Sequence, residues 1–158
     1  MKNGNEKCAI FIDVQNMAYL DPGALLATIG QEFRIEEKLA FADYSQNSMR
    51  AIATRLSLAG VDMLHVQSQQ NSGNHPKSYV DQAMVSRIWR VFHRRGDEIS
   101  TFVVVSGDSD FSHTILALKD LGKKTIVVAN PNSVSHQLLA IADRFIPLNS
   151  NEVTKHSA

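Results

Sequence analysis

The chain has 158 residues, 44% of them hydrophobic and 20% charged, and its 16 lysines and arginines balance its 16 aspartates and glutamates. This composition is typical of a globular domain with a substantial core. Zero net charge excludes a surface that is basic all over, as in proteins that coat nucleic acid. The single cysteine, Cys8, excludes an internal disulfide and a zinc site built on cysteines, and no apolar run approaches membrane-spanning length. We expect one domain over 1–148, in the cytoplasm and without a membrane partner, and a disordered polar tail over 149–158.

Strand-like and helix-like segments alternate along the chain. Apolar, β-branched runs predict strands at 8–14, 38–45, 61–66, 101–106 and 124–129, and a last short strand at 144–147. Helical spacing predicts helices over 22–33, 47–60, 77–95, 108–121 and 133–142, with a polar loop over 67–76. This alternation predicts the α/β class, with a parallel sheet flanked by helices.

Polar side chains follow two of the predicted strands where each apolar run stops. Asp13 and Asn16 follow the first run, and Asp108 and Asp110 follow the run at 101–105 after a serine and a glycine. Carboxyl ends of parallel strands meet at one edge of the sheet, where ligands bind. Crowded carboxylates there favour a divalent metal ion. Each aspartate also has a structural interpretation, as a strand-end or helix cap.

Asp81 is the third source of negative charge, in the long predicted helix 77–95. It shares one helix face with apolar side chains four, seven and eleven residues further on, Val85, Ile88 and Phe92. A carboxylate at the head of an apolar stripe is expected to point toward the sheet. The alternative is a structural ion pair with Lys77, one turn earlier.

The same helix carries a basic face away from Asp81. Arg87, Arg90 and Arg94 lie three and four residues apart. This pattern suits either a solvated surface or contacts with a phosphate backbone beside the acidic site.

Three motifs occur in a fixed order along the chain. They are Asp13-Val-Gln-Asn16, Lys77-Ser-Tyr-Val-Asp81 and Ser106-Gly-Asp-Ser-Asp-Phe111. Together they resemble the motifs of NYN domains, which are PIN-like nuclease domains, and are most similar to the LabA-like branch. The resemblance covers roughly 9–147.

The resemblance implies a Rossmann-like sheet of order 3-2-1-4-5 and metal-dependent cleavage of RNA, with RNA as the partner. Asp13, Asp81, Asp108 and Asp110 would be the catalytic ligands of Mg²⁺ or Mn²⁺, directly or through water. Asn16 would hold substrate or orient Asp13, and further substrate contacts are expected from Lys77, Ser106, Arg87, Arg90 and Arg94. Many relatives carry another aspartate where this chain has Arg87.

Three functions therefore compete. The first is a Mg²⁺- or Mn²⁺-dependent ribonuclease. The second is a non-catalytic RNA-binding or regulatory module of the same fold, which Arg87 and the neutral net charge favour. The third is a metal-dependent phosphatase. Gln15 argues against this function, because it occupies the position where an aspartyl-phosphate enzyme usually has a second aspartate. The RNA substrate, the mode of cleavage and the oligomeric state, including a homo-oligomer, stay open.

Overall fold

A single parallel sheet organises the molecule. The computed structural model describes residues 6–17, 19–67 and 77–148. Its strands are β1 (Lys7–Asp13), β2 (Arg34–Ala42), β3 (Asp62–His65), β4 (Ile99–Val105), β5 (Lys124–Ala129) and β6 (Arg144–Pro147). They form a six-stranded sheet of order β3-β2-β1-β4-β5-β6, in which every neighbouring pair is parallel. The predicted class and strand order are confirmed, and β6 extends the sheet beyond β5.

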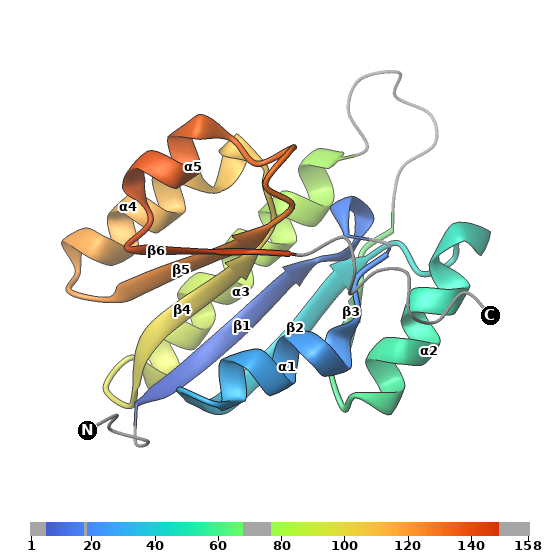
Figure 1. Cartoon of the computed structure of the whole chain (residues 1–158), viewed down its shortest axis with the longest axis horizontal. Helices are drawn as coiled ribbons and strands as arrows, with labels where there is room; N and C mark the ends of the chain where they lie inside the picture. The colour runs from blue at the N-terminus through green and yellow to red at the C-terminus, as the bar shows by residue number, and fades with distance from the viewer. Residues whose placement is uncertain (1–5, 18, 68–76, 149–158) are drawn as a thin grey trace.

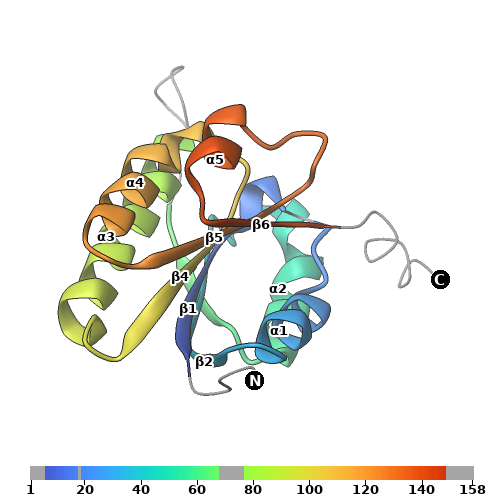
Figure 2. The same ribbon diagram turned by 60° about the vertical axis from the view of Figure 1, so that its left-hand side comes forward.

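Helices cover both faces of this sheet. They are α1 (Pro22–Gly30), α2 (Arg50–Leu58), α3 (Lys77–Arg95), α4 (Ser112–Asp120) and α5 (His136–Ile141), with short 3₁₀ turns η1 (Val14–Asn16), η2 (Asn47–Met49) and η3 (Ser109–Phe111). Figures 1 and 2 show α1 and α2 on one face and α3 and α4 on the other. No helix among the described residues has the length and apolar character needed to cross a membrane.

Several predicted boundaries are wrong at the ends of elements. The second strand begins at Arg34 rather than at residue 38, since its first residues are charged and the apolar pattern starts late. The helices predicted from 47 and 108 open with the 3₁₀ turns η2 and η3, and the helix predicted over 133–142 is only His136–Ile141. The predicted loop beyond Gln67 and the predicted tail 149–158 lie outside the described residues.

The core fills both faces of the sheet, and aromatic rings form part of it between α3 and the central strands. Phe11 of β1 stacks on Phe102 of β4 with ring centroids 6.1 Å apart, and Phe92 of α3 packs against Phe102 at 6.4 Å. Cys8 of β1 is fully buried. Burial raises the pKa of its thiol to about 12, so this cysteine is an unreactive core residue.

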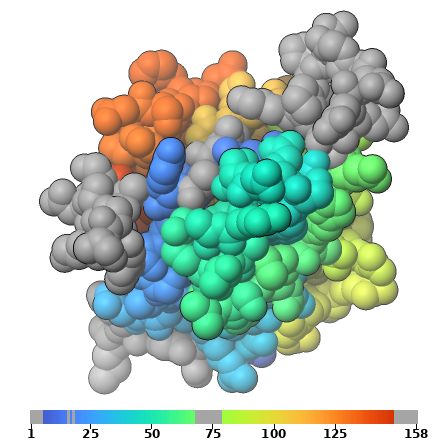
Figure 3. Space-filling view, turned by 90° about the vertical axis from the view of Figure 1, so that its right-hand side faces the viewer, coloured from blue at the N-terminus to red at the C-terminus, as the bar shows by residue number. Residues whose placement is uncertain are grey.

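The strand order creates a crevice at the carboxyl ends of β1 and β4. These two strands are neighbours, but β1 leads toward α1 on one face and β4 leads toward α4 on the other. The connections therefore diverge, which leaves room for a ligand between them. Figure 3 views the side toward which β1 and β2 point in Figure 1, with the segment around α2 (teal) at its centre and the segment around α5 (orange) at its upper left.

Candidate metal centre

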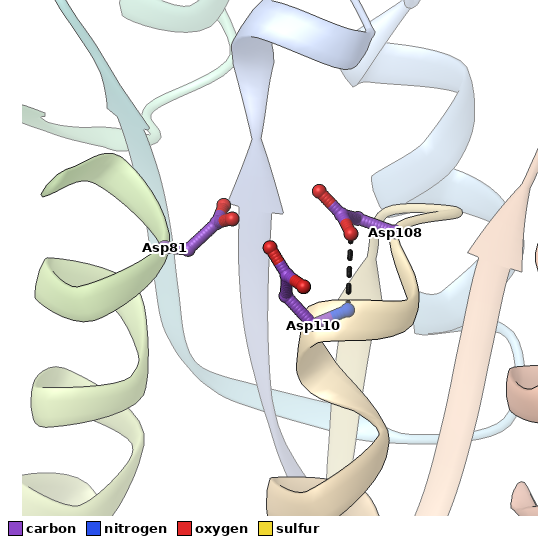
Figure 4. Close-up of side chains that lie close together, drawn as sticks. All are labelled: Asp81, Asp108 and Asp110. Carbon is purple, nitrogen blue, oxygen red and sulfur yellow. Dashed lines mark hydrogen bonds between the residues drawn. The ribbon is translucent and has the colours of Figure 1, made fainter. Parts of the chain in front are cut away.

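Three carboxyl groups from two distant segments converge beside this crevice. Asp81 comes from the first turns of α3, and Asp108 and Asp110 come from the connection between β4 and α4. One carboxylate oxygen of each lies within 4.8 Å of the other two. Figure 4 shows the three side chains pointing toward one another. Such a set of oxygens has the composition that hard divalent cations prefer.

Asp108 and Asp110 are held by the local turn. Asp108 is the N-cap of η3, and its Oδ1 accepts a hydrogen bond from the backbone N–H of Asp110 at 3.0 Å, drawn as the dashed line in Figure 4. The capping interpretation of Asp108 is therefore correct, and it coexists with a place in the acidic group. The cap fixes the spacing between the two aspartates, since one side chain binds the other's backbone.

Of the three carboxyl groups, Asp81 is in the least favourable environment for a negative charge. The residue is only 8% exposed, and its Oδ2 has no hydrogen-bond partner among the described residues. Burial, repulsion from Asp13 and Asp108, and a proton shared with Asp110 raise the pKa of Asp81 to about 7. A buried carboxylate without a compensating charge is costly. A divalent cation supplies that charge, so Asp81, Asp108 and Asp110 fit a metal ion.

Asp13 lies beside this group at the end of β1. It is 1% exposed, and its Oδ2 accepts a hydrogen bond from Ser106 Oγ at 3.0 Å. Ser106 Oγ in turn accepts from the backbone N–H of Asp108 at 3.2 Å. Ser106 is fully buried, so any effect of its side chain on a substrate passes through these two aspartates.

Gly107 allows the loop after β5 to pack against the site. A Cβ atom on Gly107 would lie 3.1 Å from Val134 Cα and 3.3 Å from Ser133 O, and the Gly107 carbonyl accepts from Ser135 N at 2.9 Å. Gly107 is not among the glycines with positive φ. The absence of a side chain at Gly107 therefore serves the close approach of the two backbone segments.

The other predicted residues lie around the centre. Asn16 is in η1 directly after β1 and Lys77 begins α3, but their side chains fall outside the described part of the structure. Arg90 and Arg94 are exposed on α3, and Arg87 is half-buried. Their contacts with a substrate stay predictions.

Two features of the structure were not predicted from the sequence. Asp43 follows β2, is 3% exposed, and accepts hydrogen bonds from the backbone and side chain of Ser45. Asp43 shows the same sequence pattern as Asp13, which is a polar residue directly after an apolar run. The second feature is an open cleft of about 470 Å³ that adjoins Asp81 and Asp110 and is also lined by Gln82, Val85 and Ser86. Gln82 and Ser86 are exposed neutral residues on a helix, and no comparable sequence pattern marks them as part of a site.

Solved structures share this architecture. A protein of unknown function from Vibrio parahaemolyticus superposes with a TM-score of 0.80 at 22% identity, over 96% of this chain and 98% of that chain. MurG from Acinetobacter baumannii gives a TM-score of 0.51 at 11% identity, over 92% of this chain but 42% of MurG. At these identities the likeness shows the fold alone.

One protein-domain family matches nearly the whole chain. No curated protein matches this chain. The model described as "NYN domain" matches residues 7–149, which span all the strands and all four aspartates of the candidate site. The chain therefore belongs to the NYN domain family of PIN-like nucleases.

Proposed function

We propose that this protein is a divalent-metal-dependent ribonuclease of the LabA-like branch of NYN domains. The observation that carries the proposal is the convergence of Asp108 and Asp110 on Asp81, whose carboxylate is buried and whose Oδ2 has no hydrogen-bond partner among the described residues. These three side chains, with Asp13 beside them, would hold Mg²⁺ or Mn²⁺. When bound, such a cation activates water and offsets the charge that develops on a phosphodiester.

The chain's own residues then have distinct roles. Ser106 holds Asp13 and the backbone of Asp108 in register, so that the carboxylates of β1 and the β4–α4 connection keep a fixed separation. The exposed guanidinium groups of Arg90 and Arg94 would contact RNA phosphates along α3, and Arg87 would add to them. Asn16 and Lys77, at the first residues after β1 and at the start of α3, would contact the substrate near the cleaved bond.

A second candidate is a non-catalytic RNA-binding module. Arg87 supports it, because many relatives have an aspartate at this position. In this case the acidic group would bind a cation for structural reasons, and the arginines would bind RNA without turnover. The two candidate functions predict different results for RNA cleavage and the same result for RNA binding.

The test is cleavage of single-stranded and structured RNA with Mg²⁺, Mn²⁺ or EDTA. Asp108→Asn keeps the capping ability of the side chain but removes a charge from the acidic group. Asp120→Asn is the matched control, because Asp120 is exposed at the other end of α4. We expect cleavage by the wild type and by Asp120→Asn that requires metal, and loss of at least about 100-fold in Asp108→Asn, the scale of losing one main electrostatic contribution. Binding of RNA without metal-dependent cleavage would favour the second candidate.

A further inference from the structure

The cleft beside the metal centre has a lining unlike that of the centre itself. Its volume is about 470 Å³, and it is lined by Asp81, Gln82, Val85 and Ser86 of α3 and by Asp110 of η3. Asp81 and Asp110 belong to both places, so the cleft adjoins the metal centre directly. The remaining three residues extend the cleft one turn along α3, away from Asp81.

The chemistry of those three residues points to a neutral ligand that has both an apolar surface and hydrogen-bonding groups. Val85 is half-buried and apolar, and Gln82 and Ser86 are exposed and lie four residues apart, on one side of the helix. The Gln82 amide both donates and accepts, as does the Ser86 hydroxyl. None of the described residues that line the cleft is a lysine or an arginine. Among these residues, a phosphate in the cleft would meet the carboxylates of Asp81 and Asp110 without a compensating cationic side chain.

We propose that this cleft binds one unpaired nucleobase of the RNA, with Gln82 and Ser86 as specificity-determining residues. The inference rests on the proposed function, which puts the phosphodiester at the metal centre. A base attached to a nucleotide adjoining that phosphodiester has an apolar face for Val85 and hydrogen-bonding edges for Gln82 and Ser86.

Occupation of the cleft limits the class of substrate. In a duplex, both faces of a base are stacked and its Watson–Crick edge is paired, so a base has to leave the helix before it can enter a side pocket. Single strands and loops offer such bases without that cost. The favoured substrate is therefore RNA that is unpaired next to the cleaved bond.

The experiment compares nucleotide preference in the wild type and in Gln82→Ala. Cleavage sites are mapped in a pool of single-stranded RNA of random sequence with Mn²⁺, and binding of short oligonucleotides that differ at one position is measured in parallel. Gln31→Ala is the matched control, because Gln31 is exposed at the end of α1 near the start of β2, at the opposite edge of the sheet. A substrate with an abasic nucleotide at the preferred position completes the set.

We expect the wild type and Gln31→Ala to prefer particular bases at one position beside the cleaved bond. Gln82→Ala should lose about tenfold of this preference, the scale of one amide contact with a base edge. The abasic substrate should react more slowly than the intact one with the wild type, and this difference in rate should be smaller with Gln82→Ala. Ser86→Ala should give a smaller loss of the same kind.

Three outcomes separate this inference from the proposed nuclease activity. Cleavage with the same base preference in Gln82→Ala and the wild type would overturn the inference and leave the nuclease intact. A base preference in binding that Gln82→Ala removes, without any cleavage, would support the cleft and contradict the nuclease. A wild type that neither binds nor cleaves RNA would contradict both.

Discussion

Ser106 joins the ends of two neighbouring strands by donating a hydrogen bond to Asp13 at 3.0 Å while accepting one from the backbone of Asp108 at 3.2 Å. All three residues lie at the carboxyl edge of the sheet, and the serine hydroxyl and Asp13 are buried. A buried carboxylate needs such donors. The relationship makes the acidic centre part of the folded framework and not an attachment on a loop.

Replacement of this serine should therefore destabilise the fold. In Ser106→Ala, Asp13 loses a buried donor and Asp108 N–H loses an acceptor, which should lower the free energy of unfolding by about 1–3 kcal/mol. Urea denaturation measures the change. Ser109→Ala is the control, because Ser109 is exposed in the adjoining turn. Equal stability of the two variants would show that the Ser106 bridge contributes nothing.

Asp81 should make the metal-free protein less stable as pH rises. Burial and the neighbouring carboxylates raise the pKa of Asp81 to about 7, against about 3.9 in an unfolded chain. Between these values the native state binds more protons than the unfolded state, so the free energy of unfolding falls from about pH 4 to about pH 7. Asp81→Asn removes this titration.

The pH effect is read from urea denaturation of both proteins in EDTA at pH 5 and pH 8. After allowance for solvent screening, Asp81→Asn should gain about 1–2 kcal/mol over the wild type between the two pH values. Subtracting the two proteins cancels the titrating groups that do not interact with Asp81, so the difference reports Asp81 together with the carboxylates beside it. An unchanged difference between pH 5 and pH 8 would show that Asp81 is ionised without penalty.

A side chain at Gly107 should destabilise the fold. In Gly107→Ala the new Cβ would lie 3.1 Å from Val134 Cα, and because that neighbour is backbone, relief requires movement of the loop after β5. A loss of about 1–3 kcal/mol is expected, as in other overpacked sites. Gly30→Ala is the control, because the nearest atom to its Cβ is a flexible side chain at 3.9 Å. A stable Gly107→Ala protein would show that the loop yields easily.

The arginines of α3 should act through phosphate charge. Arg90→Ala and Arg94→Ala are each expected to weaken RNA binding for all sequences, and to reduce the slope of log affinity against log salt by about one. Arg34→Ala is the control, since Arg34 is exposed at the start of β2 and pairs with Glu36. Salt slopes follow from fluorescence anisotropy at several ionic strengths. If the salt slopes of the variants match that of the wild type, these arginines form a solvated surface and do not contact phosphates.

The sequence predicted the elements whose patterns are governed by the core. The helix 77–95 and the strands 124–129 and 144–147 match the structure residue for residue, because apolar spacing and the stop at Gly96 determine them locally. The start of β2 could not be predicted in this way. Its glutamates Glu36 and Glu37 are held by Arg95, which lies nearly 60 residues further along the chain.

The candidate site was predictable to a similar extent. Asp81 was placed correctly toward the sheet because its helix face also carries Val85 and Ile88. The bridge through Ser106 was not predictable, since it depends on the register that places Ile12 of β1 opposite Val105 of β4. The cleft at Gln82 depends on the position of η3 relative to α3, which no local pattern encodes.

The central claim is that Asp81, Asp108 and Asp110 together bind a divalent cation. The most direct measurement is thermal unfolding with increasing Mn²⁺ for the wild type, Asp108→Asn and the exposed control Asp120→Asn. A ligand at 100 times its dissociation constant stabilises the native state by about 2.7 kcal/mol. We predict a clear rise in Tm with Mn²⁺ for the wild type and for Asp120→Asn, and a rise in Asp108→Asn that is at most a small fraction of it. An equal rise in all three proteins, or none in the wild type, would contradict the claim.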